Sequence, residues 1–192
     1  MRRPICIDID NVIACTDIVL REAIRRYSKQ GVNLRYQDVV HFDYDRCIDQ
    51  KGRSLEPGEW PYIHSQFTLN YLDRIQPFER VQMHVQKLAQ TLEIHLSTSR
   101  LPEGHDETRM WLSAHGIPYD QLHFVGHRKK HELAEGFAAA IDDDREQAVL
   151  FDERGVHAFL LAHPWNLVPS GSPVTRVDGW PNLVEAVLGR LS

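Results

Sequence analysis

Acidic residues stand in two short groups that could hold a metal ion between them. Asp8 and Asp10 stand where the β-rich run 4–9 ends, and Asp142 and Asp143 open a run of three acids after the small residues 138–141. Side chains alternate along a strand, so Asp8 and Asp10 should share one side, where a divalent cation would offset their repulsion. Carboxylate oxygens suit Mg²⁺. Taken alone, each group is more often a solvated loop or a helix cap.

Hydroxyl and basic side chains occupy two further places in the sequence. Ser97-Thr98-Ser99-Arg100 follows the alternating run at 92–97, and Arg128-Lys129-Lys130 follows Gly126. Hydroxyls and backbone amides at a strand end can bind an anion. A lysine at a helix start opposes the helix dipole, which makes a plain surface charge a slightly poorer explanation. Taken singly, turn chemistry and surface charge still explain these motifs more simply.

The elements that would position these residues follow from the hydrophobic pattern. Apolar runs predict strands at 4–9, 92–97, 122–125, 138–141 and 157–162, and helical spacing predicts helices at 16–30, 78–91, 106–115, 130–136, 145–153 and 181–191. Strands that alternate with helices predict an α/β fold whose parallel sheet is covered on both faces. Such sheets bind ligands at the carboxyl ends of their strands, where these polar motifs stand.

The segment between the first strand and the helix at 78–91 has a different character. Residues 31–75 lack clear periodicity and carry Pro57-Gly58, Pro61 and scattered aromatic side chains, which predicts an irregular, partly helical insert. Its aromatic residues could stack on a nucleobase or form the insert's own core, and the sequence favours neither. The candidates for substrate contact are Phe42, Tyr44 and Trp60, together with Arg100 at the second strand end.

Composition excludes several classes of protein. The chain has 192 residues, 42% of them hydrophobic, and a net charge of −5, which predicts a globular protein and disfavours binding to a nucleic acid polymer through charge. Its 3 cysteines cannot build a disulfide framework or a zinc ribbon. The sequence shows neither a signal peptide nor an apolar membrane span, so a soluble cytoplasmic protein without a membrane partner is expected. It leaves the oligomeric state open, with a homodimer as one option.

The order of the motifs along the chain is more specific than any one of them. Asp-x-Asp at 8–10, Thr98, Lys130 and Asp142-Asp143 resemble the four motifs of the haloacid dehalogenase (HAD) superfamily of aspartate-nucleophile phosphatases. A closer resemblance is to the 5′(3′)-deoxyribonucleotidase-like branch, carried by the sequences at 8–14, 97–100, 108–117, 164–166 and 176–180. Phosphoaspartate receiver domains use similar residues, but in them the acidic pair comes first and the lysine last. In this chain Lys130 precedes Asp142-Asp143, so the order argues against a receiver domain.

The resemblance implies a Rossmann-like, three-layer α/β/α core with a small, mainly helical cap inserted after the first strand. The core would comprise residues 1–14 and 76–192, and the cap residues 15–75. In such enzymes Asp8 would be the nucleophile that forms an aspartyl-phosphate, and Asp10 would be the general acid and base.

The same resemblance assigns the remaining positions of the site. Mg²⁺ would be held by Asp8, the backbone carbonyl of Asp10, and Asp142, with Asp143 orienting a metal-bound water or the lysine. Thr98, Ser99 and Lys130 would bind the phosphoryl oxygens. Ser97 stays open as an alternative to Thr98, and Lys129 as an alternative to Lys130.

These inferences lead to one expected function and two alternatives. The first is a Mg²⁺-dependent phosphomonoesterase acting on a (deoxy)nucleoside monophosphate as its small-molecule partner. The second keeps this chemistry and replaces the substrate by a sugar phosphate or another small metabolite phosphate. The third is a non-catalytic phosphate-binding module on the same fold. The presence of both Asp8 and Asp10 argues against this module, because binding alone needs no second aspartate for proton transfer.

Overall fold

The structure, a computed structural model, describes residues 2–192 and contains one parallel sheet. Six strands run in the order β3-β2-β1-β4-β5-β6, and all neighbouring pairs are parallel. The strands are β1 (Arg3–Asp8), β2 (Leu92–Thr98), β3 (Gln121–Phe124), β4 (Ala139–Asp142), β5 (His157–Leu161) and β6 (Thr175–Val177). The predicted α/β fold with a parallel sheet is therefore confirmed, and β6 is a strand that the sequence pattern did not indicate.

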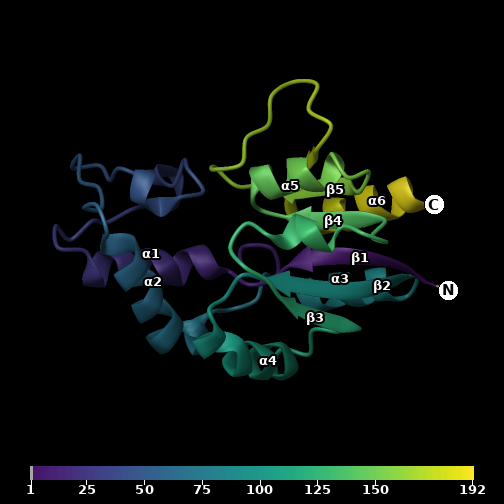
Figure 1. The fold of residues 1–192 in the computed structure, drawn as a ribbon, viewed down its shortest axis with the longest axis horizontal. Coiled ribbons are helices and arrows are strands. Elements are labelled where there is room, and N and C mark those ends of the chain that lie inside the picture. Colours follow the sequence, from purple (N-terminus) through teal and green to yellow (C-terminus); the bar gives the residue numbers. More distant parts are fainter. Residues whose placement is uncertain (1) are drawn as a thin grey trace.

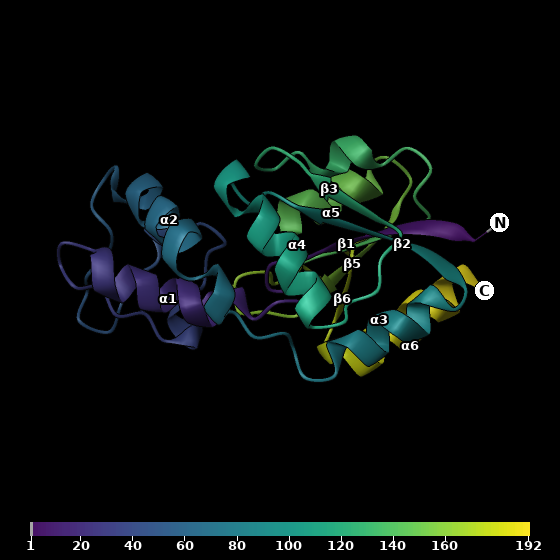
Figure 2. The same ribbon diagram turned by 90° about the horizontal axis from the view of Figure 1, so that it is seen from below.

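Alternating side chains of the strands build a separate core on each face of the sheet. Ile5 and Ile7 of β1 pack with residues of α3 (Val81–Ala89), α4 (His105–Ala114) and α6 (Gly179–Leu191). Cys6, between them in sequence, packs on the other face with Ala148 and Phe151 of α5 (Arg145–Asp152). Because both faces are covered, the central strands β1, β4 and β5 carry almost continuous apolar runs. Figure 2 shows α3 and α6 lying side by side under the sheet.

The chain between β1 and α3 lies beyond the carboxyl ends of the strands. This segment contains α1 (Thr16–Tyr27) and α2 (Glu59–Asn70), which pack on each other, and three short 3-10 turns. In Figure 1 the strands point towards α1 and α2, away from the N-terminus. The segment leaves and returns at one place, because the amide of Cys15 donates to the Gln76 carbonyl at 2.8 Å and that of Phe78 to the Ile13 carbonyl at 2.9 Å. We propose that residues 15–75 act as a cap on a core made of the rest.

Two elements differ from the sequence-based expectation in informative ways. The predicted helix at 130–136 is a short 3-10 turn, η5 (Lys130–Leu133), and the irregular insert contains the regular helix α2. Gly58 begins α2 with a φ of 84°, and Pro61 lies in its first turn, where a missing N–H costs no hydrogen bond. None of the helices within residues 2–192 is both long and apolar enough to span a membrane.

Candidate active site

Lys130 lies between the two strand-end aspartates that the sequence singled out. Its Nζ atom is 2.7 Å from Oδ2 of Asp8 and 3.1 Å from Oδ2 of Asp142. All three side chains are buried, and buried charges are tolerated when they are paired in this way. β1 and β4 are neighbours in the sheet, so their carboxyl ends bring Asp8 and Asp142 together. The lysine reaches both from η5, on the loop that leads into β4.

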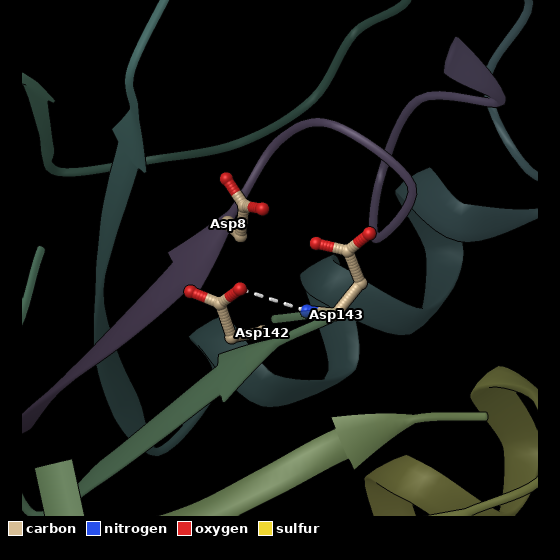
Figure 3. A group of neighbouring side chains, drawn as sticks. All are labelled: Asp8, Asp142 and Asp143. Carbon is tan, nitrogen blue, oxygen red and sulfur yellow. Dashed lines mark hydrogen bonds between the residues drawn. The ribbon is translucent and has the colours of Figure 1, made fainter. Parts of the chain in front are cut away.

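Three carboxylates converge beside this lysine. One oxygen from each of Asp8, Asp142 and Asp143 lies within 4.8 Å of the others (Figure 3). Oδ1 of Asp142 accepts the backbone N–H groups of Asp143 at 2.9 Å and Asp144 at 2.8 Å, and these two bonds fix the orientation of the carboxylate. An all-oxygen set of donors on a buried strand edge fits Mg²⁺ and does not fit a metal that prefers nitrogen or sulfur.

The protonation of this cluster depends on the positive charge beside it. Burial raises the pKa of Asp8 to about 8, an effect that Lys130 opposes and the carboxylates of Asp142 and Asp10 reinforce. Burial and the neighbouring carboxylates of Asp8 and Asp142 raise the pKa of Asp143 well above its ordinary value. The pKa of Lys130 rises well above its ordinary value, because the attraction of Asp142 and Asp8 outweighs burial. The anionic form of Asp8 therefore relies on cations, of which Lys130 is one.

Asp10 has a different environment from Asp8. Its carboxylate accepts hydrogen bonds from Thr16 Oγ1 at 2.6 Å, Thr98 Oγ1 at 3.2 Å and the Arg100 guanidinium at 2.8 Å. Burial opposes ionisation here, but the attraction and hydrogen bonds of Arg100 outweigh it and lower the pKa of Asp10. The pKa values of Asp8 and Asp10, two residues apart, are therefore shifted in opposite directions, which leaves Asp10 as the anion in this structure.

Arg100 contacts Asp10 in a way that the sequence could not specify. Both its Nε and its Nη2 atoms donate to the Asp10 carboxylate, and Nη1 donates to Thr108 Oγ1 at 3.1 Å. The side chain is almost fully buried. Arg100 was predicted as a substrate contact, and in this structure all three of its guanidinium nitrogens are engaged within the protein.

The structure separates the two pairs of alternatives at the strand ends. Thr98 reaches Asp10, whereas Ser97 Oγ accepts from Cys6 Sγ at 3.2 Å, within the sheet. Lys130 lies between the aspartates, whereas the Lys129 side chain is 60% exposed and lies 3.9 Å from Glu132. The geometry thus brings Thr98 and Lys130 to the aspartates and leaves Ser97 and Lys129 outside. Ser99 lines the cavity over Asp8.

Side chains from distant parts of the sequence hold these loops in place. Oδ2 of Asp143 accepts from Asn11 Nδ2 and from Trp165 Nε1, each at 3.2 Å. Asn166 donates to the Asp143 carbonyl at 3.0 Å, and His163 Nε2 bonds the Asn11 carbonyl at 2.7 Å. Asn11 adopts a φ of 58°, a left-handed conformation that asparagine tolerates better than most residues. Sequence reasoning assigned none of these roles, although Trp165 and Asn166 lie in a segment that carried the family resemblance.

The 15–75 segment closes a cavity over the aspartates. This inner cavity has a volume of about 150 Å³ and is lined by Asp8, Asp10 and Lys130 from the core and by Phe42, Tyr44 and Trp60 from the segment. The rings of Tyr44 and Trp60 stack on each other with centroids 5.6 Å apart, and the Tyr44 hydroxyl donates to Asp17 at 2.9 Å. All three predicted aromatic contacts thus face the cavity, although Tyr44 is also part of the hydrophobic core.

Comparisons of the sequence with known proteins give one distant relative and no family model. No protein-family model matches the chain. A Bacillus subtilis (strain 168) protein described as "Putative nucleotidase YqfW" is 20% identical over 182 residues, which cover 93% of this chain and 90% of that protein.

Solved structures match over nearly the whole chain. The haloacid dehalogenase-like family hydrolase SP0104 from Streptococcus pneumoniae has a TM-score of 0.68 at 12% identity and covers 100% of this chain and 99% of its own. A HAD family hydrolase from Deinococcus radiodurans R1 with bound phosphate and sodium has a TM-score of 0.65 at 12% identity, covering 98% and 96%. Protein Tyrosine Kinase A (PtkA) of Mycobacterium tuberculosis has a TM-score of 0.72 at 12% identity, covering 97% and 98%. The chain therefore has the fold of the haloacid dehalogenase-like hydrolases, as its motifs predicted.

Proposed function

We propose that this chain is a Mg²⁺-dependent phosphomonoesterase that uses Asp8 as its nucleophile and hydrolyses (deoxy)nucleoside monophosphates. The observation that carries the chemistry is the buried arrangement of Lys130, 2.7 Å from Asp8 and 3.1 Å from Asp142, beside the three converging carboxylates. A phosphate-binding module would have no use for a second aspartate placed for proton transfer two residues from the first.

Each side chain then has a defined part in the reaction. A carboxylate oxygen of Asp8 attacks phosphorus, and the bond between phosphorus and the leaving oxygen breaks to give an aspartyl-phosphate. Asp10 donates a proton to the leaving oxygen and later takes one from the water that hydrolyses the intermediate. Lys130 and Thr98 hold phosphoryl oxygens.

The proposed metal site uses the acidic side chains at the same edge of the sheet. Asp8, Asp142 and the backbone carbonyl of Asp10 would hold Mg²⁺, and Asp143 would lie beside it. When bound, Mg²⁺ would supply positive charge that offsets the charge of the phosphoryl group.

To give up its proton, Asp10 must first carry one, and its contact with Arg100 favours the anion. The proposal therefore requires that the Arg100–Asp10 contact weakens when a phosphoryl group with its own negative charge occupies the cavity. This requirement agrees with the position of Arg100 on the cavity wall.

Support for a nucleotide substrate comes from two sources of different kinds. The Bacillus subtilis relative carries the name of a nucleotidase, at low identity. The inner cavity also opens beside Trp60, His64 and Arg100 onto an outer cavity of about 690 Å³. Pockets of this size accept a ligand as large as a nucleoside.

A phosphate-release screen tests this proposal directly. The purified chain is treated with EDTA and assayed with nucleoside 5′-monophosphates, 3′-monophosphates, sugar phosphates and an aryl phosphate, with and without added Mg²⁺. We expect no release after chelation and recovery with Mg²⁺, and the highest kcat/KM on a nucleoside monophosphate. A higher kcat/KM on a sugar phosphate would select the second function. Phosphate binding without turnover would select the non-catalytic module.

A further inference from the structure

The passage between the inner and the outer cavity contains two histidines whose ring nitrogens form no hydrogen bond within residues 2–192. Six residues line both cavities: Asp43, Trp60, His64, Ser99, Arg100 and His127. His64 comes from α2 in the 15–75 segment, and His127 comes from the loop after β3 in the core. A leaving group attached to a phosphoryl at Asp8 can extend through this passage into the outer cavity.

Three of these six side chains already have partners. Asp43 pairs with Arg128 at 3.1 Å, and Arg100 pairs with Asp10 at 2.8 Å. Trp60 stacks on Tyr44 and on His64, with ring centroids 5.6 Å apart in both pairs. By contrast, the imidazole nitrogens of His64 and His127 make no hydrogen bond with any residue in the described range 2–192.

The two imidazoles line the same passage, and the surroundings of each disfavour its charged form. Burial lowers the pKa of His64, and His127 lowers it further, whereas Asp10 raises it. Partial burial also lowers the pKa of His127, whose side chain remains largely accessible to solvent, and Arg128 adds to the effect. A neutral imidazole offers one donor and one acceptor, which matches a hydroxyl group better than a second phosphate.

The outer cavity beyond the passage has an apolar wall on one part of its lining, while Asp45 and Arg46 contribute charged groups elsewhere. On the apolar wall Phe124 and His105 stack with ring centroids 3.6 Å apart, beside Leu101, Pro102 and Val125. The chemistry thus changes with distance from Asp8, from acids and a lysine, through two neutral imidazoles, to an aromatic and aliphatic surface. A 5′-nucleotide has the same order of groups, which are phosphate, hydroxylated sugar and base.

We propose that His64 and His127 recognise the sugar of a nucleoside 5′-monophosphate by hydrogen bonding to its ring hydroxyls, while the base enters the outer cavity. This inference rests on the proposed function and adds two specificity-determining residues to it. Because one imidazole comes from the 15–75 segment and the other from the core, a bound sugar also joins these two parts of the chain.

The test compares two substrates that differ only in the sugar hydroxyls. For the base that the parent enzyme hydrolyses fastest, kcat/KM is measured for the nucleoside 5′-monophosphate and for its 2′,3′-dideoxy analogue, and the ratio of the two is the readout. A neutral hydrogen bond is worth about 0.5–1.5 kcal/mol, so we expect a parent ratio of roughly three- to tenfold or more.

Five variants complete the design. His64→Phe keeps a ring in the stack with Trp60 and removes both nitrogens, and His127→Leu removes the second imidazole from an exposed position. Each should reduce the ratio by roughly two- to tenfold, and the double variant should bring it close to one. His64→Gln, which keeps a donor and an acceptor, should restore part of the ratio. His41→Ala is the matched control, because this exposed histidine lies in the same segment and lines neither cavity.

The outcomes separate the two proposals. A parent enzyme that treats both substrates alike, or variants that keep the parent ratio, would overturn the sugar-recognition role while leaving a phosphatase. If the parent releases no phosphate from any phosphomonoester, including the aryl phosphate, in the presence of Mg²⁺, the proposed function itself fails and the inference fails with it.

Discussion

Lys130 determines how much negative charge this site can bury. Asp8, Asp142 and Asp143 are all almost inaccessible to solvent, and moving several carboxylates out of water is costly unless cations compensate them. The lysine contacts two of the three, and the third bonds Asn11 and Trp165. The site therefore has three carboxylates and one lysine, and a further cation would bring its net charge closer to zero.

Replacement of the proposed nucleophile should remove turnover and keep the fold. Asp8→Asn preserves the size of the side chain but cannot form an acyl phosphate, so phosphate release should fall by roughly a thousandfold or more. Asp73→Asn, at an exposed acid far from the cavity, is the control. Melting curves confirm that both variants fold. Turnover of Asp8→Asn within tenfold of the parent would contradict the assignment.

Two adjacent lysines offer a matched pair for the phosphate-site assignment. Lys130→Met leaves Asp8 and Asp142 without their shared counter-ion, and breaking a buried pair in this way costs about 3–5 kcal/mol. Its phosphate release should fall about a hundredfold or more. Lys129→Met removes an exposed lysine, and its stability should change by less than about 0.5 kcal/mol. Urea unfolding and phosphate-release assays measure both effects.

A reversed result, in which Lys129→Met is the inactive variant, would exclude Lys130 as the phosphate-site lysine. The sequence could not choose between these neighbours because both stand beside the start of the same short helix. The choice depends on which side chain the 3-10 turn directs into the core, and that is set by the packing of η5 against α5. Thr98 and Ser97 posed the same problem, and there the pleat of β2 decides it.

At the scale of elements, the loops around the site depend on the last quarter of the chain. His163 bonds the Asn11 carbonyl and the Tyr36 hydroxyl, and Trp180 Nε1 donates to the Val12 carbonyl at 2.8 Å. Arg176, on the edge strand β6, donates to the His163 carbonyl at 2.9 Å. Residues more than 150 positions away in sequence therefore fix the loop that carries Asp10 and Asn11.

His163 should make the stability of the protein depend on pH. Its Nε2 atom must carry the proton, because a carbonyl only accepts, and its Nδ1 atom accepts from Tyr36. Burial lowers the pKa of His163 to about 4, with a smaller contribution from Arg176. The unfolded chain takes up the proton first as pH falls, so the stabilisation is present above about pH 6.5 and is lost towards pH 4.

Urea unfolding at pH 7 and pH 5 measures this loss, which should be about 2 kcal/mol for the parent. In His163→Gln the free energy of unfolding should lose the part of its pH dependence that comes from this imidazole. His41→Gln, at an exposed histidine, should keep the pH dependence of the parent. An equal loss between pH 7 and pH 5 in the parent and in His163→Gln would show that another group titrates.

The sequence predicted the elements with strong periodicity and missed those without it. The predicted strand at 92–97 and the predicted helix at 145–153 correspond closely to β2 and α5, because both bury one regular apolar pattern. β6 spans only Thr175–Val177 at the edge of the sheet, pairs with β5 alone and has no fully buried residue. α2 exposes the apolar side chains of Tyr62 and Leu69 and buries the acid Glu59, so it shows no simple amphipathic pattern.

At the scale of the whole molecule, the chemistry and the specificity come from different parts of the chain. The four motifs lie at the carboxyl ends of parallel strands, where any fold of this kind places them. The 15–75 segment supplies Tyr44, Trp60 and His64 to the inner cavity, and these contacts depend on how irregular loops pack. This explains why the motifs predicted a reaction and the aromatic residues alone did not predict a substrate.

Replacement of Trp60 tests whether the 15–75 segment contacts the leaving group of the substrate. Trp60 lines both cavities, and stacking on a base is worth about 1–3 kcal/mol. Trp60→Ala should therefore reduce kcat/KM for the preferred nucleotide by roughly five- to 150-fold more than kcat/KM for a small aryl phosphate, which cannot extend into the outer cavity. Tyr62→Ala is the matched control, because Tyr62 lies on the same helix, is 56% exposed and packs against Tyr27. If Trp60 serves only the core of the segment, its loss will lower the melting temperature and reduce kcat/KM equally for both substrates. Equal losses would leave the phosphatase chemistry in place and assign the stack of Tyr44 and Trp60 to stability alone.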